Sequence, residues 1–178
     1  MNNLLASIIN DSESSTQNKQ QFLHRLSQGK LTRKENPRSH MCVYFAAYDA
    51  AAKSVFIGHH KKSGLWLFNG GHMDPGETPA DTATREAAEE WGLRITRSTL
   101  PHVELITLTK IEHPELVICE WHYDFWHFLP FDNHLFIPKK ENLDTEFYSY
   151  GWVSYDEAEK LLTSQPTHEA LRYLRKRK

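Results

Sequence analysis

The spacing of apolar and polar positions predicts a chain in which helices and strands are mixed. Within residues 1–40 the apolar side chains form two groups with helical spacing, Leu4 to Ile9 and Phe22 to Leu26. Residues 40–48 and 54–58 are apolar and rich in strand-forming types, and the polar stretch between them has the composition of a turn. The pattern therefore predicts an N-terminal helical extension followed by a β-hairpin.

The remaining elements follow from the same reading. Residues 65–68 are apolar and precede an Asn-Gly-Gly segment, which predicts a buried strand followed by a flexible loop. Further predicted elements are strands over 103–111 and 116–129 separated by 112–114, a helix from a Ser154–Glu157 capping box through 162, and a last helix over 167–175. Because no regular βαβ repeat occurs, an α+β fold is expected, an α/β/α sandwich with a mixed sheet.

One helix, over residues 79–92, has the clearest end signals. Thr78 is a suitable N-cap, Pro79 suits the first helical position, and Asp81 stands where a capping-box acid belongs. Gly92 provides a left-handed stop. A helical wheel places Ala80, Ala83, Ala87 and Trp91 on one side, expected to be buried, and Thr82, Glu86, Glu89 and Glu90 on the other, with Arg85 at its edge.

The carboxylates on this helix are unfavourably placed for a purely solvated face. Glu86 and Glu90 form a like-charge pair at i,i+4, and Glu90 lies in the last turn, where the helix dipole repels anions. No lysine is placed to offset them. A hard divalent cation would remove both penalties, since carboxylate oxygens are its preferred ligands. The pattern therefore indicates a metal site.

Composition and charge narrow the class of protein. The 178 residues suffice for one catalytic domain, and 21 Lys and Arg against 23 Asp and Glu give a net charge of -2, so nucleic acid is not expected as a partner. Two cysteines are too few for a disulfide framework, which favours a reducing compartment. The N-terminus lacks the features of a signal peptide or membrane span. We expect a soluble cytoplasmic protein without a membrane partner.

The segment from Gly71 to Leu93 resembles the Nudix box. Gly71 is followed by five residues and Glu77, then by seven residues and Arg-Glu-Ala-Ala-Glu-Glu-Trp-Gly-Leu, which is similar to the family motif at each of its fixed positions. The resemblance implies the Nudix fold and magnesium- or manganese-dependent hydrolysis of a diphosphate linkage. It also implies metal ligands, namely Glu86, Glu89, Glu90 and the carbonyl of Gly71, with Glu77 and Arg85 as an ion pair that stabilises the loop. The division between metal binding and proton acceptance among the three acids stays open.

The chain departs from the family pattern downstream. Many members supply a further glutamate, but Gly151 precedes Trp152 here, so Glu146 or Glu120 could replace it. Strand periodicity places Glu120, His122, Asp124 and Trp126 on one face, where the polar members either line the cleft or form an exposed edge. His72, inside the loop, either contacts substrate phosphate or faces solvent.

The resemblance and the apolar pattern together predict an N-terminal helical extension over 1–38 and a Nudix hydrolase domain over 39–178. Its substrate is a small nucleotide-type molecule, a nucleoside triphosphate by default, and a homodimer is plausible. Two other classes remain in view. A noncatalytic nucleotide-binding module is the first, and an enzyme similar to isopentenyl-diphosphate isomerase, in which Cys42 would be the reactive cysteine, is the second. The intact box favours the hydrolase.

Overall fold

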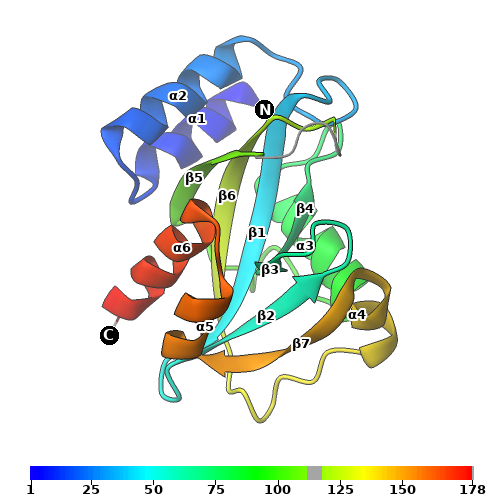
Figure 1. Cartoon of the computed structure of the whole chain (residues 1–178). Helices are drawn as coiled ribbons and strands as arrows, with labels where there is room; N and C mark the ends of the chain where they lie inside the picture. The colour runs from blue at the N-terminus through cyan, green and yellow to red at the C-terminus, as the bar shows by residue number, and fades with distance from the viewer. Residues whose placement is uncertain (112–117, 178) are drawn as a thin grey trace.

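A seven-stranded mixed sheet lies between two groups of helices (Figure 1). The computed structural model describes residues 1–111 and 118–177. The strands are β1 (Ser39–Asp49), β2 (Ser54–His60), β3 (Trp66–Leu67), β4 (Asn69–His72), β5 (Leu105–Lys110), β6 (Trp121–Pro130) and β7 (Phe147–Ser154). The helices are α1 (Asn2–Asp11), α2 (Thr16–Ser27), α3 (Pro79–Glu90), α4 (Lys140–Glu146), α5 (Tyr155–Leu161) and α6 (Gln165–Lys176).

Strand β1 is the centre of the sheet. It pairs antiparallel with β2 and with β4 and parallel with β6, and the sheet path runs β3-β2-β1-β6-β5. The predicted hairpin of β1 and β2 is confirmed, with Tyr48 opposite Val55. Since neighbouring side chains on a strand point to opposite faces, β1 contributes to two cores. Met41, Val43 and Phe45 pack with α1, α2 and α3, whereas Ala46 and Tyr48 pack with α5 and α6. The α+β sandwich expected from the sequence is confirmed.

The N-terminal helices belong to the main core. Leu5 and Ile9 of α1 and Phe22 and Leu26 of α2 are buried together with the β1 side chains of the first core. Phe22 meets Phe125 of β6 edge-on, with ring centroids 5.4 Å apart. The two apolar groups of residues 1–40 are therefore amphipathic helices that cover one end of the sheet (Figure 1).

Helix α3 begins and ends as predicted. Thr78 caps it, since its hydroxyl accepts from the Asp81 amide while the Asp81 carboxylate accepts from the Thr78 amide at 2.9 Å. Pro79 occupies the first turn, and Gly92 has the positive φ of 63° that ends the helix. At α5, Ser154 accepts from the Glu157 amide.

Three expectations need correction or completion. The Asn-Gly-Gly segment belongs to strand β4 and is not a flexible loop, because its three residues and the following His72 all pair with β1. Strand β6 begins at Trp121, and residues 118–120 before it are not in a strand. The expected separator at 112–114 and the expected start at Leu116 lie outside the described residues. Helix α4 was not predicted, because its seven residues carry too little apolar periodicity. Within residues 1–111 and 118–177, no helix has the length and apolar character that crossing a bilayer requires.

Candidate functional site

An ion pair ties the loop before α3 to the helix itself. Arg85 donates from Nε and Nη2 to the two carboxylate oxygens of Glu77, at 2.8 and 3.0 Å, and also from Nη2 to the carbonyl of His72 at 3.0 Å. Glu77 further accepts from the Thr82 hydroxyl and the Asp74 amide. Bidentate charge-assisted bonds of this kind fix orientation as well as energy. Arg85 therefore fastens β4, the loop and α3 into one rigid unit.

Glu86 lies against the backbone of β4. A Cβ added to Gly71 would overlap the Glu86 carboxylate, so only glycine permits this close approach. The Glu86 side chain is 13% exposed and accepts from Arg85 Nη1 at 2.7 Å. Burial raises the pKa of Glu86, although the neighbouring guanidinium of Arg85 opposes the shift. Glu89 points outward, with its side chain 58% exposed and 3.4 Å from Arg85.

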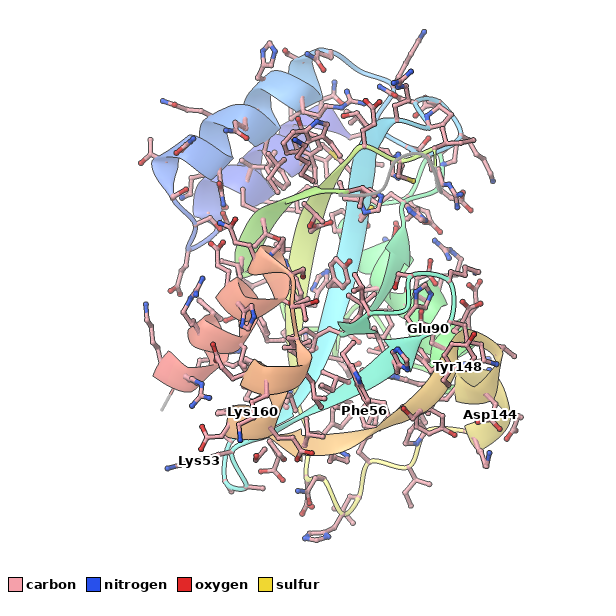
Figure 2. The ribbon with its side chains drawn as sticks, viewed as in Figure 1. Lys53, Phe56, Glu90, Asp144, Tyr148 and Lys160 are labelled. Atoms are coloured by element: carbon pink, nitrogen blue, oxygen red, sulfur yellow. The ribbon has the colours of Figure 1, made fainter. Side chains whose placement is uncertain are left out.

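Glu90 is the most deeply placed of the three acids. It is 8% exposed and accepts a hydrogen bond from the Asn69 side-chain amide. Burial raises the pKa of Glu90 to about 8; the Asn69 bond opposes this rise, while repulsion from Glu86 and Glu146 adds to it. Figure 2 marks Glu90 on the side of the molecule where α3 meets α4.

The expected division of α3 into a buried and a solvated side is only partly right. Ala83, Ala87 and Trp91 are buried as predicted, but so are Thr82 and Glu90. The reason is that α3 contacts β1, β4 and also α4, which leaves less of its surface free. The like-charge penalty is also smaller than the sequence implied, because Arg85 pairs with Glu86.

The two candidates for a downstream acid separate clearly. Glu146, at the end of α4, is close enough to Glu90 to raise its pKa, and its carboxylate lies 3.0 Å from Lys62 Nζ and 3.6 Å from His60 Nε2. Glu120 precedes β6 and pairs with Arg38 at the surface. Because Glu120 is outside the strand, the expected row from Glu120 to Trp126 begins at His122.

His72 and His122 come together with two residues of β1. Their ring centroids are 5.1 Å apart, and each lies within 5 Å of the ring of His40. Cys42 is opposite His72 in the β1–β4 register. Burial lowers the pKa of all three histidines. The pKa of His72 falls to about 3, and that of His122 falls well below its usual value. Sequence reasoning missed His40 and Cys42 as partners, although both occupy alternate positions of one strand.

Asp124 does not line a cleft. It is fully buried and accepts from the hydroxyls of Thr107 and Thr109 on β5. Burial raises its pKa to about 7, opposed by those two hydrogen bonds. Strand periodicity predicts that Asp124 either lines the cleft or forms part of an exposed edge. Both expectations are wrong for Asp124, because it is an interior polar group.

A hollow of about 530 Å³ opens beside Glu86. Small-molecule sites are commonly of this size. Its lining residues are Arg33, Lys34, Pro37, His72, Asp74, Arg85, Glu86 and Ile118. Sequence reasoning missed Arg33 and Lys34, which bring positive charge from the segment before β1; the adjacent basic pair was the available signal. Lys34 bonds Asp74 at 3.0 Å.

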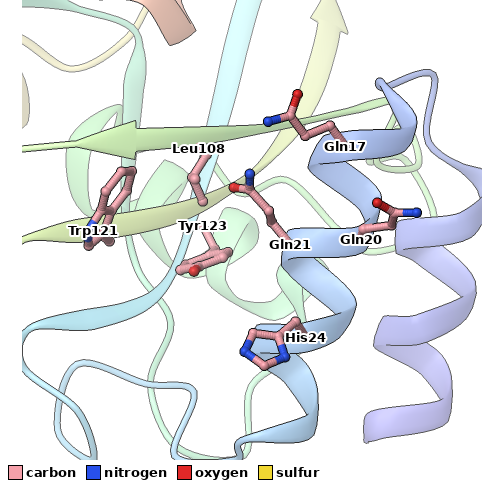
Figure 3. Close-up of a pocket in the computed structure, with 7 residues that line it drawn as sticks. All are labelled: Gln17, Gln20, Gln21, His24, Leu108, Trp121 and Tyr123. Atoms are coloured by element: carbon pink, nitrogen blue, oxygen red, sulfur yellow. The ribbon is translucent and has the colours of Figure 1, made fainter.

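A second hollow lies between α2 and the strands β5 and β6, and no residue of α3 lines it. Figure 3 shows its lining residues, Gln17, Gln20, Gln21, His24, Leu108, Trp121 and Tyr123. It contains no carboxylate and no arginine or lysine. Of these two hollows, only the first is lined by the charged side chains that phosphate or metal binding requires.

The fold and the site together define a class of protein. It is an α/β/α sandwich in which the acidic helix α3 lies against strand β4, with Glu86 in contact with Gly71. Residues 38–174 match the family model described as the NUDIX domain. The chain belongs to the Nudix family, as its resemblance to the box predicted.

Individual relatives are more distant. The RNA pyrophosphohydrolase of Psychrobacter arcticus is 30% identical over 115 residues, which cover 56% of this chain and 59% of that protein, so the chain spans less than two thirds of its length. The Escherichia coli dihydroneopterin triphosphate pyrophosphohydrolase has a TM-score of 0.59 at 18% identity over 75% of this chain and 92% of its own. A Caenorhabditis elegans Ap4A hydrolase has a TM-score of 0.53 at 20% identity over 74% and 93%. These structures establish a shared fold.

Proposed function

We propose that the protein is a magnesium-dependent hydrolase that cleaves a diphosphate linkage in a nucleotide-type substrate. The observation that carries the proposal is the acidic face of α3, where Glu86 lies against Gly71 of β4 and Glu90 is buried beside Asn69 of the same strand. Glu146 of α4 is near enough to Glu90 to raise its pKa. Carboxylates gathered in this way repel one another unless a cation lies among them. Family membership and the RNA pyrophosphohydrolase relative support the same reaction type.

The residues present fit a hard divalent cation. All the candidate ligands offer oxygen, namely Glu86, Glu89, Glu90, the Gly71 carbonyl and Glu146, and magnesium and manganese accept such ligands. The raised pKa of Glu90 indicates a buried carboxylate that holds a proton when no cation compensates it. When bound, the metal would neutralise phosphate oxygens and acidify a water molecule.

The chain's own residues would divide the remaining work. Glu90 and Glu89 would hold the metal, and Glu86, which lies against Gly71 and lines the hollow, would assist by accepting a proton. Arg85 holds Glu86 in place through their 2.7 Å contact. Arg33 and Lys34 attract the phosphate groups into the hollow that they line. His72 lines the same hollow and would contact the phosphates through one of its two ring nitrogens, which leaves the other nitrogen free.

We propose a nucleoside triphosphate as the substrate, with a triphosphorylated RNA 5′ end as second candidate, because the named relative acts on RNA. The discriminating assay is a panel with Mg²⁺ that follows phosphate and pyrophosphate release from nucleoside triphosphates, nucleotide sugars, dinucleoside polyphosphates and triphosphorylated RNA. Turnover of at least one member is expected. Turnover of none would instead favour a noncatalytic nucleotide-binding module.

The isomerase alternative is weaker. Its reactive residue would be Cys42, which is 4% exposed, and burial raises the pKa of the Cys42 thiol well above its usual range. A buried thiol with a raised pKa is a poor nucleophile or proton donor at neutral pH. The structure around Cys42 therefore favours the hydrolase.

The role of the downstream acid has a matched test. Glu146→Gln is expected to lower kcat about 10- to 100-fold and to raise the magnesium concentration needed for half-maximal rate, because it removes an oxygen ligand or its neighbour. Glu120→Gln, which breaks only the surface pair with Arg38, is the control and should leave both unchanged. Equal activity of the two variants would remove Glu146 from the proposed site.

The wider setting is also proposed. The two free, buried cysteines support a reducing, cytoplasmic environment. The proposed partner is a small nucleotide-type substrate, without nucleic acid or membrane. The proposed oligomeric state is a homodimer, which light scattering coupled to size-exclusion chromatography would measure.

A further inference from the structure

Four side chains from three adjacent strands form a compact group of nitrogen and sulfur donors. His40 and Cys42 come from β1, His72 from β4 and His122 from β6, and one ligand atom of each lies within 4.8 Å of all the others. Figure 1 shows why this is possible, because β1 runs between β4 and β6. In the register, Cys42 stands opposite His72, and His40 stands beside His122. All four therefore project from the same face.

A hydrogen bond fixes which ring nitrogen of His40 carries the proton. His40 Nδ1 lies 3.0 Å from the carbonyl oxygen of Asn36, which can only accept, so Nδ1 carries the proton and the lone pair is on Nε2, 3.7 Å from the Cys119 thiol. Metal-binding histidines are held by a carbonyl partner in this way. His122 Nε2 is buried and has no hydrogen-bond partner within the described residues. A buried nitrogen without a partner costs free energy unless something occupies it.

Ordinary packing explains the group less well. The positions of His40 and Cys42 are buried and those of His72 and His122 are partly buried, yet three of the four hold imidazoles rather than apolar side chains. Direct imidazole contacts satisfy few of their donors and acceptors. The Cys119 thiol, 3.7 Å from His40 Nε2, satisfies one nitrogen and leaves the others.

From this geometry we infer a second metal site, in which His40, Cys42, His72 and His122 bind one transition-metal dication of the zinc type. Three nitrogens and one sulfur are the ligands that zinc prefers, whereas magnesium requires oxygen. Tetrahedral zinc places its ligand atoms roughly 3.3 to 3.7 Å apart. Contraction from separations of at most 4.8 Å requires only small side-chain rotations.

The thiol is consistent with this assignment. Burial raises the pKa of Cys42 in the metal-free chain. A dication in contact with the sulfur supplies the charge that stabilises the thiolate, so binding releases the thiol proton to solvent. The inference does not depend on the proposed hydrolase activity, since the donors differ in kind from the carboxylates of α3.

The four-ligand set describes a closed site, which is typical of a structural metal. Such an ion would join β1, β4 and β6 at one end of the sheet and would hold His72, whose carbonyl is bonded by Arg85. Because Gly71 precedes His72, the ion would stiffen the backbone on which the Glu86 carboxylate lies. Its expected effect is on stability and on the rigidity of that backbone.

The test measures metal binding directly on the full chain, after removal of metal with a chelator. Equilibrium dialysis with Zn²⁺ in the presence of excess Mg²⁺ should give one tightly bound zinc per chain. Co²⁺ in its place should give the intense visible bands of a tetrahedral ion and a near-ultraviolet thiolate-to-metal band. Bound zinc should also raise the midpoint of thermal unfolding.

Matched variants assign the ligands. Cys42→Ser should abolish the thiolate band and weaken zinc binding by about 100-fold or more, and His122→Gln should weaken binding while keeping the band. Cys119→Ser and Glu90→Gln are the controls, and both should keep the band and the stoichiometry. Circular dichroism of each metal-free variant checks folding.

Two results would overturn the inference: no zinc uptake by the folded wild-type chain, or zinc binding that survives Cys42→Ser and is lost in Glu90→Gln. The second would assign the bound zinc to the carboxylates of α3. Loss of catalytic turnover alone would not bear on this site.

Discussion

The buried carboxyl of Glu90 makes the stability of the metal-free protein depend on pH. Its pKa is raised from 4.5 to about 8, mainly by burial. Between these two values the unfolded chain has released its proton while the folded chain retains it, so stability falls as pH rises. Each pH unit in this window costs up to about 1.4 kcal/mol. From pH 5 to pH 8 the loss from this group amounts to about 3 kcal/mol.

Glu90→Gln removes this titration but keeps an oxygen that can accept from Asn69. Both proteins are unfolded with urea in the presence of a chelator. The free energy of unfolding of the variant, relative to that of the wild type, should rise by about 3 kcal/mol between pH 5 and pH 8. Addition of Mg²⁺ at pH 8 should then stabilise the wild type and leave the variant unchanged, because the variant lacks the charged ligand. The variant should also lose turnover on any substrate found.

Parallel stability profiles of the two proteins from pH 5 to pH 8 would refute the reasoning, since they would mean that Glu90 titrates normally in the folded state. A magnesium effect of equal size in both proteins would refute the ligand assignment separately.

Three further variants test other parts of the structure. Gly71→Ala should displace the Glu86 carboxylate and lower kcat about 100-fold with unchanged helix content by circular dichroism. Arg85→Lys should lose the bidentate bond to Glu77, destabilise the fold by about 1–2 kcal/mol in urea titrations and lower kcat about 10-fold. For Asp124→Asn, the free energy of unfolding relative to the wild type should rise by about 2–3 kcal/mol between pH 5 and pH 8, because the wild type with its pKa of about 7 loses stability as pH rises from 4 to 7. A difference between the two proteins that is the same in urea titrations at both pH values would contradict this expectation.

Local features of the chain could be predicted because their causes are local. The cap at Thr78, the stop at Gly92 and the spacing of the acids on α3 all follow from residues a few positions apart. The family and the mixed sheet followed from the same short-range signals. The strand character of the Asn-Gly-Gly segment was missed, because its pairing partner β1 lies about 30 positions earlier and glycine has low strand propensity.

The amino-acid sequence by itself predicted the side chains that we propose for the chemistry, namely the three acids of α3, and the ion pair of Glu77 with Arg85. Tertiary structure alone decided how those groups behave. Packing of α3 against two strands and α4 buries Glu90 and raises its pKa, and the position of α4 brings Glu146, and not Glu120, near Glu90. Parallel pairing of β1 with β6 joins His40 to His122. Burial and register depend on segments distant in sequence, so no local pattern encodes them.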